Sequence, residues 1–207
     1  MGHIHKQMVE ETRRRIENTF IELIGEHGFE HVTVKQIADK AGVNRGTFYR
    51  HYTDKYALMS TVQENMLTLF KQRVRQIRPE GILESLRTKQ LYPPFLQIFY
   101  FIEEYASVLH IILGENGDPR FNKQIKDVIR DMMETYLLAD VPTKHNPLFK
   151  QYIVAFLTSA ILGLIQEWLE QLHTGEKQSA KDFAEVHFEI ISFMSNLKER
   201  LERLQAD

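Results

Sequence analysis

The segment 33–55, TVKQIADKAGVNRGTFYRHYTDK, restricts the possible folds of this chain more than any other segment. Thr33 and Gln36 have the spacing of a capping box, in which the threonine hydroxyl and the glutamine side chain each accept a hydrogen bond from the other residue's amide. Gly42 can supply the left-handed backbone that ends a helix. The segment therefore predicts two short helices joined by a glycine turn, which is a helix-turn-helix.

The second helix, predicted over 45–51, carries the side chains that indicate a function. Asn44 is a suitable N-cap for it. Phe48 and Tyr52 are four residues apart, so we expect both to face inward and anchor the helix. In a helix-turn-helix the second helix enters the DNA major groove. Arginine can bond guanine through two hydrogen bonds, worth roughly 1–3 kcal/mol of discrimination, so Arg45 is the leading candidate for base recognition.

Further polar residues around this helix are expected at the DNA. Thr47 can contact a thymine methyl or a phosphate, while Tyr49 and His51 are suited to the sugar-phosphate backbone. A glycine within a helix costs about 1 kcal/mol relative to alanine. At Gly46 either the missing side chain lets the backbone approach the duplex closely, or the first turn of the helix is frayed. Lys55 follows the predicted Thr53 cap of the next helix. Its ammonium group either pairs with a phosphate near the positive end of that helix or is an ordinary solvated group.

This segment resembles the DNA-binding domain of the TetR family of bacterial transcriptional regulators. The matching parts are His27-Gly28-Phe29, VTVKQIADKAGV and NRGTFYRHYTDK, which cover about the first quarter of the chain. The resemblance implies a homodimeric repressor that leaves a palindromic double-stranded operator when it binds a small-molecule effector. It also implies DNA contacts at ten positions, of which Arg50 is the least consistent in the family: Thr33, Lys35, Asn44, Arg45, Gly46, Thr47, Tyr49, Arg50, His51 and Lys55.

Composition is compatible with a DNA-binding protein once the charge is divided along the chain. The net charge is −2, but residues 1–60 hold nine Lys and Arg against eight Asp and Glu. Phosphate affinity would then come from a few placed groups, and salt should weaken it.

Cysteine is absent from the 207 residues, which excludes disulfides and thiolate metal sites and favours a cytoplasmic protein. We expect neither a signal peptide nor a membrane-spanning helix.

No strand-like alternation is present, and the pattern predicts an all-α chain of about nine helices. Residues 1–55 are expected to form a three-helix, homeodomain-like DNA-binding domain, and 56–207 a helical ligand-binding and dimerisation domain. A long helix from a Thr53 cap toward Arg75 would join the two domains. The other helices are predicted at about 8–27, 34–41, 45–51, within 78–92, 93–113, 119–138, 147–173 and 179–204. The helix over 93–113 either continues or re-forms after Tyr105.

The last helix has apolar residues at alternating steps of four and three, which is typical of a helix–helix seam. With a second apolar stripe and Gly163 on the preceding helix, this predicts a four-helix interface between two subunits, the alternative being a monomer core. The predicted interface residues are Gly163, Phe183, His187, Ile190, Met194, Leu197 and Leu201.

Aromatic residues and methionines are frequent between Leu67 and Trp168, with a few polar residues among them. Such a set is typical of a pocket for an apolar or aromatic effector, although the same pattern also occurs in ordinary cores. The candidate pocket residues are Phe70, Phe99, Tyr100, Glu103, His110, Met133, Tyr136, Phe156 and Trp168.

Enzymatic motifs are not found: the chain has no Gly-rich phosphate loop, HExxH, GxSxG or cysteine nucleophile, so we expect no catalytic residues, cofactor or metal site. Within the same function class, an activator or a regulator controlled by a protein partner is possible. In another class, a helical small-molecule-binding protein with a vestigial helix-turn-helix would have the same pattern.

Overall fold

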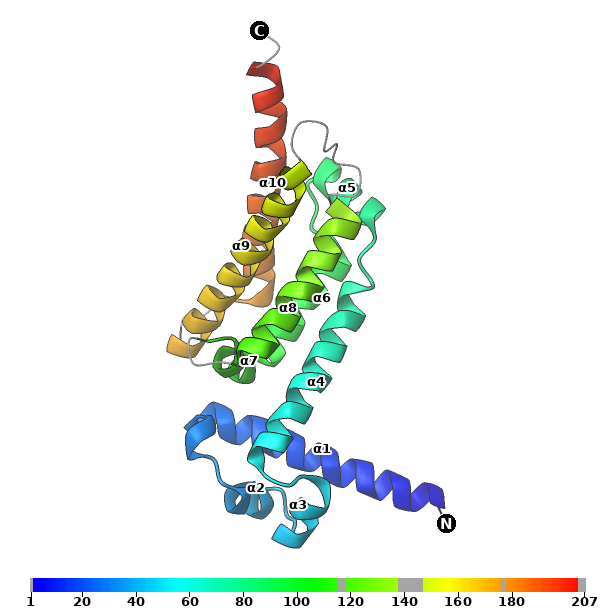
Figure 1. Cartoon of the computed structure of the whole chain (residues 1–207), viewed down its shortest axis with the longest axis vertical. Coiled ribbons are helices and arrows are strands. Elements are labelled where there is room, and N and C mark those ends of the chain that lie inside the picture. The colour runs from blue at the N-terminus through cyan, green and yellow to red at the C-terminus, as the bar shows by residue number, and fades with distance from the viewer. Residues whose placement is uncertain (1, 115–117, 138–146, 176–177, 205–207) are drawn as a thin grey trace. The chain divides into compact units, whose positions relative to one another are not determined.

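The computed structural model describes residues 2–114, 118–137, 147–175 and 178–204, with side chains over 5–114, 118–135, 148–175 and 178–193. Within these ranges the chain forms ten α-helices and no strand, which confirms the all-α prediction (Figure 1). The helices are α1 (Gly2–His27), α2 (Val34–Lys40), α3 (Arg45–His51), α4 (Lys55–Val74), α5 (Pro79–Thr88), α6 (Pro93–Glu104), α7 (Ala106–Leu113), α8 (Pro119–Met132), α9 (Pro147–Thr174) and α10 (Ala180–Leu204).

The chain divides into two compact units. The first comprises residues 1–68 and 107–122, and the second comprises 69–106 and 123–207. The first unit thus contains the whole predicted DNA-binding segment and adds most of α4, nearly all of α7 and the first residues of α8. The chain passes between the two units three times: within α4 after residue 68, at the start of α7 after residue 106, and within α8 after residue 122.

The first unit is built around the apolar face of α1. Ile16, Phe20 and Ile24 recur at the spacing of a helical face and are fully or almost fully buried. They lie in one core with Ile37 of α2 and Phe48 of α3, and α2 packs on both α1 and α3. Burying a side chain of this size contributes about 1.5–3 kcal/mol, so this shared core, more than helix propensity, holds the three short elements together.

A helix from much later in the chain, α7, completes this unit. A Cβ atom added to Gly25 of α1 would lie 3.1 Å from both Cβ and Oγ of Ser107. That is closer than side-chain carbons normally approach, so the glycine permits the contact between α1 and α7. Leu109 and Ile112 of α7 are buried as well.

In the second unit, α10 packs along α6. Trp168 of α9 is fully buried and stacks on Phe183 of α10 with ring centroids 4.5 Å apart. Ser179 and Asp182 form the predicted capping box, with the Asp182 amide donating to Ser179 Oγ at 3.2 Å and the Ser179 amide donating to Asp182 Oδ2 at 3.1 Å. A carboxylate oxygen of Glu103 accepts from the Ala180 amide at 2.9 Å, which adds a second acceptor at the start of α10.

Several predicted helix limits were wrong. α1 begins at Gly2, well before residue 8. The cap of α4 is Asp54, whose Oδ1 accepts from the Ala57 amide at 2.7 Å, and not Thr53. The segment 93–113, predicted to continue or re-form as a helix after Tyr105, re-forms: it is broken at Tyr105 into α6 and α7, which accounts for ten helices in the described residues where nine were predicted. After α8 the backbone continues as a π-helix over Met133–Leu137.

The expectation that no helix could span a membrane was also too strict. By length and composition alone, Leu148–Thr174 of α9 is apolar enough to do so, because Thr158, Ser159 and Gly163 are only weakly polar interruptions. Most side chains of α9 are not buried within this chain. We expect an apolar partner to cover the exposed apolar side chains of α9.

Candidate nucleic-acid interface and ligand cavity

The turn between α2 and α3 forms as the sequence predicts. The Thr33 amide donates to Gln36 Oε1 at 2.9 Å and the Gln36 amide donates to Thr33 Oγ1 at 3.3 Å, which completes the capping box. Gly42 has a φ of 65°, a conformation that favours glycine. The Val43 amide then donates to the Ala38 carbonyl at 3.0 Å and closes the end of α2.

α3 is held by a cap at its start and by two aromatic anchors. Asn44 Oδ1 accepts from the Thr47 amide at 2.7 Å, which confirms the predicted cap. Phe48 is fully buried and Tyr52 is 6% exposed, so both anchors face inward as predicted. The rotation of α3 about its own axis is thereby set.

Gly46 has a local role that the sequence did not suggest. The residue lies within α3, so the first turn is helical. A Cβ atom at this position would lie 3.3 Å from Asn44 Oδ1, which is tighter than ordinary van der Waals contact. The missing side chain therefore leaves room for the cap, whether or not DNA also approaches here.

The outward face of α3 presents most of the predicted DNA-contacting residues. Arg45 and Arg50 are exposed, and Tyr49 is 56% exposed. Thr47 and His51 are half-buried, and Arg50 donates to Thr47 Oγ1 at 3.0 Å. This face thus combines guanidinium, hydroxyl and imidazole groups, which are suited to base edges and phosphate oxygens.

Two residues at α2 extend the polar surface. Thr33 and Lys35 are both exposed, at the cap and in the first turn of the helix. In the part of the chain that the structure describes, no ion pair involves Lys35 or Arg45, whereas Lys40 is paired with Glu26 at 2.7 Å. The unpaired cations are the ones available to a phosphate.

Lys55 has an internal role that the sequence did not predict. Its Nζ donates to the carbonyl oxygens of Phe29 and Glu30, both at 3.0 Å. It also lies 4.6 Å from the centroid of the Phe29 ring, a favourable cation–π distance. The lysine thus ties the start of α4 to the 29–31 turn, and one of its three N–H groups remains for a phosphate.

A single carboxylate joins three elements behind α3. Glu17 of α1 accepts from Arg13 Nε at 2.9 Å, from the Tyr52 hydroxyl at 2.6 Å and from Asn65 Nδ2 at 3.2 Å. Burial, reinforced by the bond to Glu17, raises the pKa of Tyr52 well above its ordinary value. The hydroxyl therefore stays protonated and donates. Glu17 was not among the predicted site residues, because its partners are 35 and 48 residues away in sequence.

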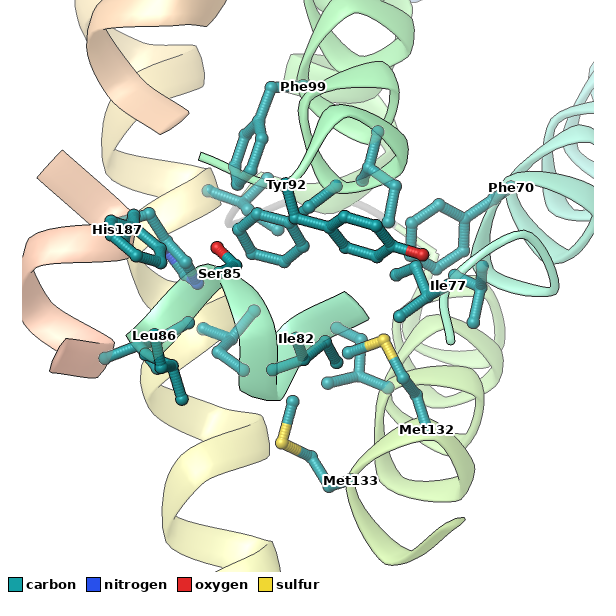
Figure 2. A pocket seen from close by; sticks show the side chains of 18 residues that line it. Phe70, Ile77, Ile82, Ser85, Leu86, Tyr92, Phe99, Met132, Met133 and His187 are labelled. Carbon is teal, nitrogen blue, oxygen red and sulfur yellow. The ribbon is translucent and has the colours of Figure 1, made fainter. Parts of the chain in front are cut away.

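The second unit encloses an apolar cavity of about 60 Å³. Figure 2 shows the side chains that surround it, which come from α4, α5, α6, α8, α9 and α10, from the residues that precede α5 and α6, and from the first residue of the π-helix after α8. Among the residues that the structure describes, no Asp, Glu, Lys or Arg lines it. Its polar lining residues are Ser85, Tyr92 and His187.

Three of the predicted pocket residues, Phe70, Phe99 and Met133, line this cavity, and others have different positions. Tyr100 and Phe156 are exposed, at 42% and 60%. Glu103 is exposed and caps α10. These three lie on outward faces of helices that are apolar on more than one side, so periodicity alone could not orient them.

The other three predicted pocket residues are Trp168, His110 and Tyr136. Trp168 is buried but packs on Phe183 and is not in the cavity lining, and its Nε1 donates to the Gln178 carbonyl at 3.1 Å. His110 lies in α7, which belongs to the first unit. The Tyr136 side chain lies outside the described residues.

Two residues assigned to the dimer interface belong to the interior instead. Phe183 is 6% exposed and His187 is 3% exposed, because both face α6 and α9 of their own chain. Ile190 and Gly163 are exposed, and among the described residues no atom of another element lies within 4 Å of a Cβ built on Gly163. The side chains of Met194, Leu197 and Leu201 lie outside the described residues.

Apolar side chains are nevertheless exposed along both of the last helices. On α9 they recur at helical spacing, and on α10 they follow steps of three and four. The residues are Leu148, Phe149, Tyr152 and Phe156 on α9 and Val186, Ile190 and Phe193 on α10, with exposures between 39% and 67%. We call these seven residues the exposed apolar face.

His187 is the least satisfied polar group in the cavity wall. Its ring lies among those of Phe95, Phe99 and Phe183, with centroids 5.6, 5.5 and 6.2 Å away. Nδ1 is buried and has no hydrogen-bond partner among the described residues. Burial lowers the pKa of His187 to about 4, because the charged form would be desolvated. The ring is therefore neutral at pH 7.

Comparison with known proteins finds two family models that match this chain. A family model described as bacterial regulatory proteins of the tetR family matches residues 20–62, and one described as a transcriptional regulator C-terminal region matches residues 89–193. The second match alone covers half of the chain. The chain belongs to the TetR family of transcriptional regulators.

Relatives of this TetR-family chain support the same assignment. The transcriptional regulator SAB2452 from Staphylococcus aureus is 36% identical over 111 residues, which cover 54% of this chain and 58% of that protein. The chain spans about half the length of the curated relatives it matches.

Solved structures extend the likeness to nearly the whole chain. A TetR transcriptional regulator from Streptococcus agalactiae has a TM-score of 0.62 at 20% identity and covers 92% of this chain and 99% of its own. NalD, described as the secondary repressor of the MexAB-OprM multidrug efflux pump of Pseudomonas aeruginosa, has a TM-score of 0.55 at 25% identity and covers 89% and 96%.

For this TetR-family regulator we expect Tyr52→Phe to lower the free energy of unfolding by about 1–2 kcal/mol, because Glu17 loses a buried donor. Denaturant unfolding followed by circular dichroism measures it. Tyr49→Phe is the matched control, since it removes an exposed hydroxyl and should leave stability unchanged. Equal stability of the two variants would contradict the role assigned to Glu17.

We also expect acid to destabilise the regulator through His187. In the unfolded chain the imidazole titrates near 6.5, whereas in the folded chain its pKa is about 4. The unfolded state therefore binds more protons between these values, and the free energy of unfolding falls by roughly 3 kcal/mol as the pH is lowered across them. Unfolding followed by the fluorescence of Trp168 measures this. His187→Phe should lack this component, and an unchanged pH slope in that variant would contradict it.

Proposed function

We propose that this regulator recognises a specific palindromic DNA sequence, represses transcription there, and leaves the DNA when a small molecule binds the cavity of its second unit. The observation that carries the proposal is the fixed orientation of α3. Phe48 and Tyr52 hold one face of that helix inward, so Arg45 and Tyr49 project outward. This is the arrangement that a recognition helix in the major groove requires.

The roles at the DNA follow from exposure and charge. Arg45, in the first turn of α3, is proposed to read a guanine, because its guanidinium is exposed and free of an ion pair among the described residues. Thr33 and Lys35 on α2, with Tyr49 on α3, are proposed to hold phosphates and so set the register. Asn44 uses its carbonyl oxygen as a cap, which leaves its side-chain N–H groups for a phosphate.

A homodimer is proposed to present two such helices. The exposed apolar face on α9 and α10 carries large side chains that water solvates poorly, and a second copy of the same face would cover them. The exposed Gly163 on α9 lets another helix approach closely. A two-fold dimer places its recognition helices about 34–36 Å apart, which explains why a palindromic operator is proposed.

Release by an effector is proposed from the cavity and from the path of the chain. The cavity is lined by α4 and α6, and each of these helices leads directly into the first unit. A ligand that favours one arrangement of these helices would change the equilibrium between DNA-binding and non-binding forms. The repressor role is proposed by similarity to NalD, which is described as a repressor. The cytoplasm is the proposed location, because the DNA target lies there.

We predict that Arg45→Ala weakens binding to DNA by roughly fivefold to 150-fold, because a bidentate contact to guanine is lost. The duplex should be selected from a random library with the native protein, and affinity measured by fluorescence anisotropy. Lys40→Ala is the matched control, since it also removes one positive charge from the first unit but from a residue paired with Glu26. Arg45→Ala binding that equals the control would refute the proposed recognition helix.

We predict that Phe156→Glu weakens self-association at least tenfold, because it would bury a charge between the subunits. Light scattering across a dilution series measures the change. Leu83→Glu is the control, because Leu83 is 64% exposed on α5 and lies outside the exposed apolar face, while Phe156 is 60% exposed. A Phe156→Glu protein that stays dimeric at all concentrations where the native protein does would exclude this interface.

A further inference from the structure

The chemistry of the cavity wall restricts the ligand it can accept. Figure 2 draws eighteen lining side chains, and all but Ser85, Tyr92 and His187 are apolar. A charged ligand group placed here would lose its hydration with no opposite charge among the described lining residues. Burying an unpaired charge is far more costly than burying a neutral polar group. The part of the ligand inside the cavity must therefore be neutral.

Two of the three polar lining residues already have internal partners. The Ser85 hydroxyl donates to the Gln90 carbonyl. The Tyr92 hydroxyl accepts from the Arg78 amide at 3.3 Å. These two bonds link the residues that flank α5, so each hydroxyl has one partner within the fold.

His187 is different, because its Nδ1 has no partner among the described residues although the side chain is 3% exposed. An unpaired buried polar atom costs stability and is unusual in a native protein unless it has a function. A water molecule is a poor partner at this point, since a buried water needs two to four polar neighbours and, apart from His187, the wall offers only the Ser85 and Tyr92 hydroxyls, each already in one hydrogen bond. An apolar ligand with one polar atom satisfies Nδ1 without that requirement.

A hydroxyl group is the polar atom that suits His187 in either tautomer. In neutral imidazole one ring nitrogen donates and the other accepts. A hydroxyl can do both, so it pairs with Nδ1 whichever role that atom has. The aromatic rings of Phe95 and Phe99 beside His187 favour an aromatic body next to the hydroxyl.

We propose that the effector is a neutral apolar molecule with a single hydroxyl group, preferably a phenol, whose hydroxyl is hydrogen-bonded by Nδ1 of His187. This inference rests on the effector cavity proposed above and adds the chemical class of its ligand. The charged, strongly polar and purely hydrocarbon classes are each disfavoured by a named feature of the wall.

Size adds a second requirement, because the cavity of about 60 Å³ is smaller than the roughly 150 Å³ that holds benzene. Side chains of the wall must move when a ligand binds. Met132 and Met133 are the residues best able to do so, since methionine is flexible and adapts to irregular spaces. Met133 also begins the π-helical segment, and such segments occur often at functional sites. Ligand binding is thus coupled to the end of α8.

The test compares three probes of similar shape: 4-propylphenol, propylbenzene and 4-propylbenzoate. Isothermal titration calorimetry at pH 7 on the whole 207-residue chain gives their affinities. We expect 4-propylphenol to bind about tenfold more tightly than propylbenzene, because it satisfies Nδ1. We expect 4-propylbenzoate to bind more weakly than either, since its carboxylate is charged at this pH.

Variants separate the hydrogen bond from the shape of the cavity. In His187→Phe the preference for 4-propylphenol over propylbenzene should disappear while propylbenzene still binds, which also demonstrates that the cavity is folded. In Tyr92→Phe, the matched control, the preference should persist.

Equal binding of 4-propylphenol and propylbenzene to the native protein would overturn the role of His187 but leave the cavity as a site. Tighter binding of the benzoate would overturn the neutral class, and failure of all three probes would overturn this inference and the proposed effector cavity together.

Discussion

A recognition helix of seven residues has no stability of its own, so the surface that α3 presents depends on the burial of Phe48 and Tyr52. Isolated helices shorter than about 12 residues are marginal in water. The two aromatic side chains provide what the short helix lacks, because they insert into the core built on α1. The hydrogen bond from the Tyr52 hydroxyl to Glu17 also restricts the orientation of the Tyr52 ring. A buried ring alone could pivot, whereas a ring whose hydroxyl is bonded at 2.6 Å cannot do so freely.

The two units differ in how the polar groups inside them are satisfied. In the first unit Glu17 gathers three donors, so its carboxylate and the Tyr52 hydroxyl are satisfied internally. In the second unit Nδ1 of His187 is buried without a partner among the described residues. The first arrangement stabilises one geometry. The second leaves a polar atom whose satisfaction depends on what else binds there, which is the property expected of a ligand site.

Local signals in the sequence predicted much of the fold. The capping boxes at Thr33 and Ser179 form as expected, and Gly42 adopts the left-handed conformation that its position suggested. These features depend on residues three or four apart, so no tertiary contact is needed to predict them. The break at Tyr105 and the π-helix after α8 are not marked by such a local signal.

The cavity and the interface were predicted less well, for a physical reason. α9 and α10 are apolar on more than one side, and periodicity indicates which residues share a face without indicating what that face contacts. Phe183 and His187 were therefore assigned to a partner subunit although they pack inside their own chain. Phe156 was assigned to a pocket although it is exposed. Gly46 likewise suggested contact with DNA before its closeness to Asn44 was known.

By itself the sequence determined the helical class, the helix-turn-helix and the polar residues on its outer face, because these follow from local hydrogen bonds and from the 3.6-residue period. Only the tertiary structure decided that α7 joins the DNA-binding unit, that Glu17 orients Tyr52, and that His187 faces a cavity. Each of these depends on residues far apart in the chain. Such contacts arise from the packing of whole helices, which no local pattern encodes.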